Sequence, residues 1–168
     1  MNEYAGLDQR YMFLNWGFNV RPTELQAGFG LEQLKRWPAF HAQRLKNVNY
    51  FQNLLKEFSD LMCLMEVSAD ADCSWLALPI MLSPDCPFSK DEFLLYLEEQ
   101  GIETRPIVAG NIARQPVCKL FPELQDDNLP GADQVHNRGF YIGLHPVEDN
   151  KKLDRIISVF HNFITKNS

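Results

Sequence analysis

Apolar side chains recur with helical spacing in two long segments of the chain. Residues 38–58 predict a helix with one buried face, formed by Phe40, Val48, Phe51, Leu55 and Phe58. Residues 149–165 show the same pattern with Leu153, Ile156, Ile157, Phe160 and Ile164. Each segment is therefore expected to pack one side against a core.

A further helix is predicted upstream, from Thr23 to about Trp37. Thr23 and Gln26 have the spacing of a capping box, and Pro22 stops any earlier helical turn. Pro38 suits the first turn of a new helix. The pattern therefore predicts two consecutive helices that meet at Pro38.

Three shorter segments predict strands. The apolar run 74–83 is bounded by Cys73 and Pro84, and two further segments, 102–107 and 139–146, also read as strands. Pro106 places the segment 102–107 at a sheet edge or a strand end. A helix between the first two strands starts with a capping box, Ser89 and Glu92, and stops at Gly101.

The order of elements indicates the fold class. Helix, helix, strand, helix, strand, loop, strand and helix follow one another, and residues 108–138 read as loop-rich. There is no strict βαβ rhythm and no GxGxxG after a strand, which disfavours a doubly wound nucleotide fold. The prediction is an α+β protein with a small antiparallel or mixed sheet, covered by helices on one side.

Composition excludes several classes of function. A net charge of −6 with interspersed signs argues against general nucleic-acid binding, and no apolar run approaches the ~18 residues of a membrane span. The N-terminus lacks the form of a signal peptide, so we expect a cytoplasmic protein. The four cysteines show no CxxC and the four histidines no HxxxH, which predicts reduced thiols and no metal site.

Two glycines, Gly28 and Gly30, lie where the first helix should be strongest. Each costs about 1 kcal/mol relative to alanine in a helix interior. Both allow another backbone to approach closely. That partner is either the second helix of the same chain or another subunit, and residue types alone do not separate the two.

Two loops carry candidate binding residues. Asn19 and Arg21 precede the capped helix, and "RPIVAGNIARQP" holds Arg105, Asn111, Arg114 and Gln115. Arginines can fork onto phosphates and amides can read hydroxyls, which suits a phosphorylated, polyhydroxylated ligand. The alternative is a turn with ordinary solvated charges, which spacing alone favours for Asn19 and Arg21. His145 reads as structural, and no nucleophile with an adjacent base is recognisable, so no catalytic residue is assigned.

Three separated stretches resemble one known family. "GFNVRPTELQAGFGLEQLKRWPAFHAQRLKN", "GIETRPIVAGNIARQP" and "FYIGLHPVEDNKKLDRIISVF" are similar, in order, to motifs of the DegT/StrS-type sugar-nucleotide aminotransferases and dehydratases. These enzymes use pyridoxal phosphate on an aspartate-aminotransferase-like fold. The "AGN-x-x-RQP" form looks most like the 3-dehydratase branch, which makes 3-deoxy sugars.

The resemblance implies that this chain is a C-terminal portion. Residues 1–37 would be the end of the large domain with an interface helix, and 38–168 the C-terminal small domain. The family's Schiff-base lysine, replaced by histidine in 3-dehydratases, would lie in a region that this chain does not match. The cofactor, pyridoxal or pyridoxamine 5'-phosphate, would belong to the complete enzyme.

The resemblance also implies roles for single residues. Asn19 matches an asparagine that reaches the cofactor phosphate across a homodimer, although Phe18 replaces the usual tyrosine. Arg21 matches a basic position near the sugar-nucleotide site, and Arg105, Asn111, Arg114 and Gln115 fall in the substrate-facing segment.

The expected function is that of an enzyme on an NDP-4-keto-6-deoxy sugar in lipopolysaccharide, O-antigen or other cell-surface polysaccharide biosynthesis. One alternative is a non-catalytic ligand-binding or dimerisation module with the same fold. Another is an α+β domain without a ligand.

Overall fold

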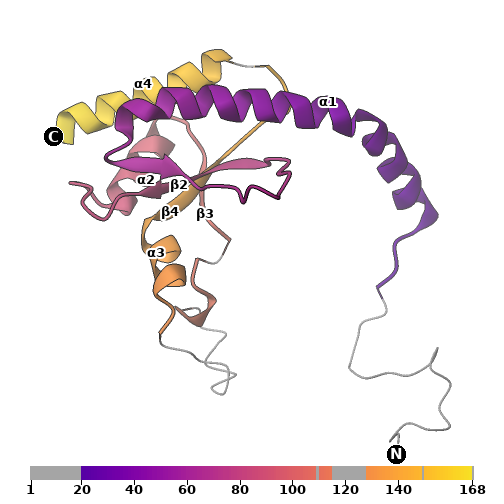
Figure 1. Cartoon of the computed structure of the whole chain (residues 1–168), viewed down its shortest axis with the longest axis horizontal. Coiled ribbons are helices and arrows are strands. Elements are labelled where there is room, and N and C mark those ends of the chain that lie inside the picture. Colours follow the sequence, from indigo (N-terminus) through magenta and orange to yellow (C-terminus); the bar gives the residue numbers. More distant parts are fainter. Residues whose placement is uncertain (1–19, 109, 115–127, 149, 168) are drawn as a thin grey trace, which may run out of the picture. The chain divides into compact units, whose positions relative to one another are not determined.

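The computed structural model describes residues 20–108, 110–114, 128–148 and 150–167 (Figure 1). The chain divides into two compact units, residues 1–36 and 37–168. The sheet and its core belong to the second unit.

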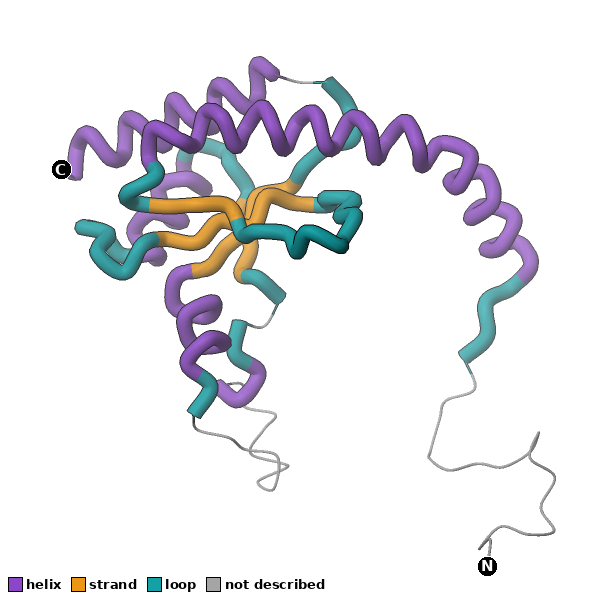
Figure 2. The backbone as a smooth tube through the Cα atoms, in the orientation of Figure 1, coloured by secondary structure: helices purple, strands orange, loops and turns teal. Residues whose placement is uncertain are grey.

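The two helices expected on either side of Pro38 are one continuous helix, α1 (Glu24–Leu55), followed by the 3-10 turn η2 (Lys56–Phe58) (Figure 2). The prediction of a helix boundary at Pro38 was wrong. Proline lacks one N–H, but the helical bonds on either side of that gap can hold the chain together. At the start of α1, the Thr23 amide donates to Gln26 Oε1 at 2.8 Å, which confirms that half of the capping box.

The sheet has four strands in the order β1 (Met62–Leu64), β2 (Ala77–Leu82), β4 (Gly139–Gly143) and β3 (Thr104–Pro106). All three pairings between these strands are antiparallel. The register places Leu78 opposite Ile142, and Thr104 faces Ile142 from the other side. Pro106 lies at the end of the edge strand β3, as predicted, a position at which proline is tolerated in a sheet. The three-residue strand β1 was not predicted.

Helices cover one face of this sheet (Figure 1). They are the second part of α1, α2 (Lys90–Glu99) and α4 (Asn150–Asn167). Alternate residues of β2 point toward them and are buried, as the two-residue period of a strand requires. The fully buried centre of the core comprises Phe51, Leu78, Ile80, Phe93, Leu97, Phe140 and Phe160. The α+β class with helices on one side of an antiparallel sheet is therefore confirmed.

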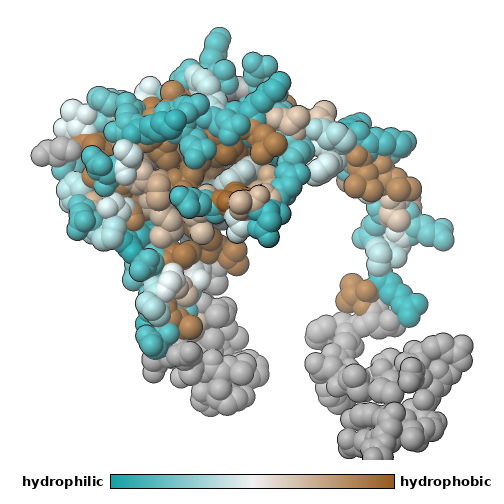
Figure 3. All heavy atoms as spheres, viewed as in Figure 1, coloured by the Kyte–Doolittle hydropathy of each residue, from teal (hydrophilic) through white to brown (hydrophobic). Residues whose placement is uncertain are grey.

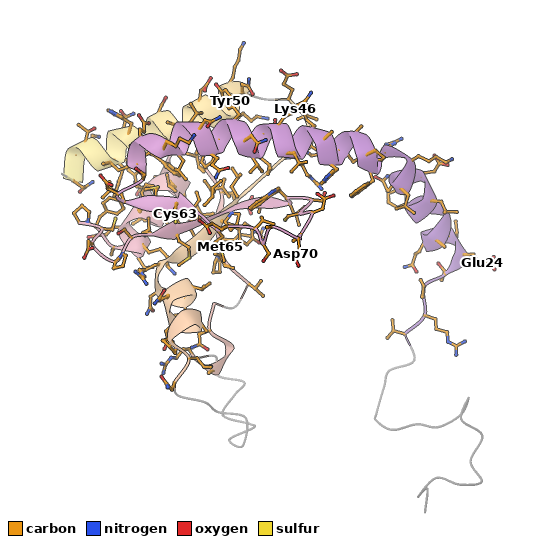
Figure 4. The ribbon with its side chains drawn as sticks, viewed as in Figure 1. Glu24, Lys46, Tyr50, Cys63, Met65 and Asp70 are labelled. Carbon is orange, nitrogen blue, oxygen red and sulfur yellow. The ribbon has the colours of Figure 1, made fainter. Side chains whose placement is uncertain are left out.

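Polar contacts also tie α1 to the rest of the second unit. Asn47 is buried, and its amide donates to the carbonyl oxygens of His145 and Val147 at 3.0 and 2.7 Å. Tyr50, labelled in Figure 4, donates its hydroxyl to Asp154 of α4 at 2.6 Å. These bonds satisfy groups at the helix contacts that would otherwise cost free energy on desolvation.

The capping box predicted for α2 is present in both directions. Ser89 Oγ accepts from the Glu92 amide at 3.2 Å, and the Ser89 amide donates to Glu92 Oε2 at 3.0 Å. Gly101 follows the helix with φ +76°, a left-handed conformation that favours glycine. Local sequence thus sets both ends of this helix.

Residues 108–138 are less loop-like than predicted. They contain the turn η3 (Ile112–Arg114) and the helix α3 (Pro130–Arg138), which runs directly into β4. Pro130 starts α3, since its fixed φ suits a first turn. None of the residues of α3 is buried, so no apolar period could reveal it.

The first half of α1 exposes large apolar side chains, including Leu25, Phe29, Leu31 and Leu34 (Figure 3). A Cβ added at Gly28 or Gly30 would meet nothing within 4 Å. The separate second helix, expected as one possible packing partner of these glycines, does not form, because residues 38–55 continue α1.

Candidate functional site

The loop that follows β3 is pressed closely onto α3. Gly110 has φ +65°, and a Cβ there would lie 2.6 Å from His136 Nδ1 and 2.8 Å from His136 Cα. The Asn111 amide lies 3.4 Å from His136 Nδ1 and donates to it. No other residue type fits this approach without displacing the loop or the helix.

Asn111 is the buried polar centre of this contact, with 1% of its surface exposed. Its Nδ2 donates to Asp133 Oδ1 at 2.7 Å, and its Oδ1 accepts from the Ala113 amide at 3.0 Å. Both ends of the amide are engaged, as burial of such a group requires.

Arg114 forks onto the same carboxylate. Its Nε donates to Asp133 Oδ1 at 3.0 Å and its Nη2 to Asp133 Oδ2 at 2.8 Å, a bidentate pair. Hydrogen bonds from Arg114, and then from Asn111, lower the pKa of Asp133 from 3.8 to about 2. Asp133 is therefore ionised at any physiological pH.

The helix that carries Asp133 is itself attached to the body of the second unit. Lys90, at the start of α2, donates its ammonium to the carbonyl oxygen of His136. At the far end of α3, a Cβ at Gly139 would come within 2.7 Å of the Val135 carbonyl oxygen, so the turn into β4 is tight. The Asp133 carboxylate is thus presented by a fixed element. We call Gly110–Arg114 together with Asp133 and His136 the loop–α3 cluster.

Arg105 belongs to a different group of side chains. Its Nε and Nη2 both donate to Glu103 Oε1, at 3.0 and 2.6 Å, which raises the pKa of the guanidinium further. It lines a hollow of about 790 Å³ whose other polar walls are Glu103, Tyr141, His145, Lys152 and Arg155. Arg155 also donates to the Gln100 carbonyl oxygen at 2.6 Å.

Of the six residues predicted for binding, the structure joins two. Asn111 and Arg114 meet on Asp133, while Arg105 lies in the hollow. Asn19 and Gln115 lie outside the described residues. Arg21 is exposed just before α1 and belongs to the first unit.

Sequence reasoning missed Asp133, His136, Lys152 and Arg155. Asp133 lies in the stretch 108–138 that was read as loop-rich, and the only available signal was its place three residues after the helix-starting Pro130. His145, read as structural, contributes its carbonyl to Asn47 and also lines the hollow.

Within the described ranges, no three His, Cys, Asp or Glu side chains come together in a way that could hold a metal ion. No helix found there is both long and apolar enough to cross a membrane.

Comparison with known proteins assigns the family. The family model described as "DegT/DnrJ/EryC1/StrS aminotransferase family" matches residues 3–161. The chain belongs to this family. The resemblance noted from three sequence stretches is therefore confirmed.

Curated members of the family are similar along almost the whole chain. The lipopolysaccharide biosynthesis protein RfbH of Salmonella typhimurium is 32% identical over 96% of this chain. A GDP-4-keto-6-deoxy-D-mannose 3-dehydratase of Escherichia coli is 31% identical over 90% of it. The matched chain spans only 37% and 39% of the length of these two relatives, so it corresponds to a portion of them.

Solved structures of the family have the same fold over this portion. GDP-4-keto-6-deoxy-D-mannose-3-dehydratase of Escherichia coli, with bound hydrated PLP, matches 95% of this chain with a TM-score of 0.76 and 28% identity. A mutant GDP-4-keto-6-deoxymannose-3-dehydratase with bound GDP-perosamine matches 90% of it with a TM-score of 0.76 and 29% identity. Each match covers 40% of the solved chain.

Proposed function

We propose that this chain is the C-terminal portion of a pyridoxal- or pyridoxamine-phosphate-dependent enzyme. The complete enzyme acts on an NDP-4-keto-6-deoxy sugar, as a 3-dehydratase or an aminotransferase, in lipopolysaccharide or other cell-surface polysaccharide biosynthesis. The observation that carries this proposal is the family match over residues 3–161. Within the family, the solved relatives contain PLP and GDP-perosamine.

The 3-dehydratase is the favoured branch. Curated relatives at 28–31% identity over 90% of the chain are GDP-4-keto-6-deoxy-D-mannose 3-dehydratases. The loop sequence Ala109–Gly110–Asn111 with Arg114 resembles that branch. The substrate class that follows is a nucleoside-diphosphate-linked 4-keto-6-deoxy hexose.

The part of the enzyme represented here supplies contacts rather than the reacting groups. Asn19 is proposed to bind the cofactor phosphate, and Arg21, Arg105, Asn111, Arg114 and Gln115 are proposed to serve the substrate site. When bound, the cofactor supplies the electron sink for bond breaking at the sugar. The described residues do not form a complete site for it, so no chemical step is assigned to them.

The proposed arrangement of the complete enzyme has three further parts. Residues 1–37 are assigned to the end of the large domain and 38–168 to the small domain. The working form is a homodimer in the cytoplasm, in which Asn19 reaches a cofactor held mainly by the other subunit. The exposed apolar residues on the first half of α1 support burial of that segment against more protein.

A hybrid enzyme tests the proposal. The upstream part of the Escherichia coli 3-dehydratase, joined to this chain at the family-matched region, is expected to bind pyridoxal phosphate with its visible absorbance. It is also expected to convert a GDP-4-keto-6-deoxy hexose.

The controls are the complete Escherichia coli enzyme and its upstream part alone. A hybrid that unfolds cooperatively, and is therefore folded, but stays colourless would contradict the proposed cofactor. A coloured hybrid that binds nucleotide sugar without turnover would favour the non-catalytic binding module instead.

A further inference from the structure

We propose that Asp133 is a positioning residue for the substrate-facing loop, which it fixes on α3 through Asn111 and Arg114. The identity of the ligand rests on the proposed function, but the positioning of the loop does not. Nothing in the sequence patterns or the comparisons assigns a role to this carboxylate.

One carboxylate holds two residues of the loop at once. Asp133 Oδ1 accepts from Asn111 Nδ2 and Arg114 Nε, and Asp133 Oδ2 accepts from Arg114 Nη2, all within 3.0 Å. The partners lie 22 and 19 residues upstream in the sequence. Loss of this carboxylate therefore removes three charge-assisted bonds from one short segment.

The two loop residues have different exposures, and this separates their roles. Asn111 is buried with both ends of its amide engaged, so it shapes the backbone by holding the Ala113 amide. The Arg114 side chain keeps 48% of its surface exposed, against 27% for Asp133. Arg114 is therefore the one of the two loop residues placed to meet a ligand, and Asp133 sets its direction.

The helix α3, which carries Asp133, is also held in place through His136. His136, one turn of α3 beyond Asp133, contacts Gly110 and accepts from Asn111 through its ring, while its carbonyl accepts from Lys90 of α2. A side chain held by a fixed helix can orient a loop without touching the ligand.

A purely electrostatic role and a positioning role of Asp133 predict opposite effects of Asp133→Asn on anion binding. Asp133→Asn removes a negative charge beside Arg114, so a purely electrostatic role would make anion binding tighter. A positioning role makes binding weaker, because Arg114 and the loop lose their fixed direction. The sign of the change decides between the two.

The first experiment uses the 168-residue chain. Amide hydrogen exchange of Ala113, followed by NMR, is expected to become at least about tenfold faster in Asp133→Asn. Asn111→Ala, which removes the acceptor itself, sets the upper limit. Asp70→Asn makes the same charge change on an exposed loop and is expected to leave Ala113 unchanged.

Unchanged exchange in Asp133→Asn would overturn the proposal. If that variant does not fold, Asp133→Glu replaces it. The added methylene displaces a carboxylate of the same charge, so exchange is expected to lie between wild type and Asn111→Ala. Wild-type exchange in Asp133→Glu would overturn the proposal equally.

The second experiment measures GDP affinity in the hybrid enzyme. Asp133→Asn is expected to weaken GDP binding about tenfold while the cofactor absorbance stays the same. Unchanged or tighter GDP binding would overturn the proposal that Asp133 positions Arg114 for the ligand. If the unsubstituted hybrid does not bind GDP, the proposed function fails, while the exchange result still decides whether Asp133 fixes the loop.

Discussion

Gly110 combines a left-handed backbone, φ +65°, with a close approach to His136. In Gly110→Ala the new methyl would meet His136 Nδ1 at 2.6 Å and strain the backbone as well. We expect a loss of about 1–3 kcal/mol in the free energy of unfolding. Urea denaturation measures it.

Gly131 provides the matched control for this substitution. It lies in α3, and an added Cβ would meet nothing within 4 Å. Gly131→Ala is expected to be neutral or to stabilise by up to about 1 kcal/mol, because alanine is the better helix former. Equal effects at the two glycines would contradict the contact between Gly110 and His136.

Asp133 gives a prediction for pH dependence. Its pKa is about 2 in the folded chain against an ordinary 3.8, first because Arg114 and then because Asn111 donates to the charged form. Because the folded pKa is the lower one, the stabilisation is present above pH 3.8 and is lost as pH falls through about 2.

Carbon-13 NMR titration of the Asp133 carboxyl checks this directly. The midpoint is expected near 2, and Arg114→Gln is expected to move it up toward 3.8. Gln33→Ala changes a half-buried side chain on α1, away from this ion pair, and is expected to leave the midpoint in place. An identical midpoint with and without Arg114 would show that the ion pair does not form in solution.

At the scale of elements, α2 is defined by its capping box. Ser89→Ala removes the acceptor for the Glu92 amide and is expected to cost about 1 kcal/mol of stability. The Ser89 amide lowers the pKa of Glu92 most, and the Ser89 hydroxyl lowers it further. Ser89→Ala removes only the hydroxyl bond, so the pKa of Glu92 should rise part of the way toward its ordinary value. Thermal unfolding and a carboxyl titration measure the two effects.

Ser158→Ala on α4 serves as the comparison. There the hydroxyl donates back to the Asp154 carbonyl inside the helix, so its loss should be nearly neutral. A Ser89→Ala change that costs no more than this one would mean that the cap contributes nothing to stability.

The elements differ in how far sequence could predict them. Strand β2, helix α2 and helix α4 followed from apolar period and caps, since these signals are local. The boundary at Pro38 was wrong because one missing hydrogen bond is too little to end a long helix. Helix α3 escaped notice because it buries no residue, and β1 because three residues carry no period.

At the scale of the whole molecule, the first half of α1 carries exposed apolar side chains among its charged ones. Leu25, Phe29, Leu31 and Leu34 are all exposed, and a helical turn of 3.6 residues spreads them around the axis. Exposed apolar side chains that lie close together usually mark a surface that contacts other protein. We therefore expect the isolated chain to self-associate.

Phe29→Ser with Leu34→Ser is expected to reduce that self-association, measured by light scattering over a range of concentrations. Glu32→Ser with Lys35→Ser changes the same helix without removing apolar surface or net charge, and should have little effect. A monomeric wild-type chain at high concentration would contradict the expectation.

The candidate site was predicted in part. Spacing and resemblance singled out the loop with Asn111 and Arg114, but not the carboxylate that holds both. That partner lies about twenty residues away in a segment without periodic signal. Arg105, predicted with the same loop, pairs with Glu103 instead, because side chains two residues apart in an extended chain lie on the same side.

The sequence by itself determined what depends on near neighbours: the capping box at Ser89, the glycine stop at Gly101, the edge position of Pro106 and the buried faces of the helices. It also determined the family, through motifs spread along the chain. Only the tertiary structure decided that α1 continues through Pro38 and that Asp133 joins Asn111 to Arg114. The physical reason differs between the two outcomes. Asp133 contacts residues that are far from it in the chain, and α1 continues because its many helical hydrogen bonds outweigh the one that Pro38 cannot make.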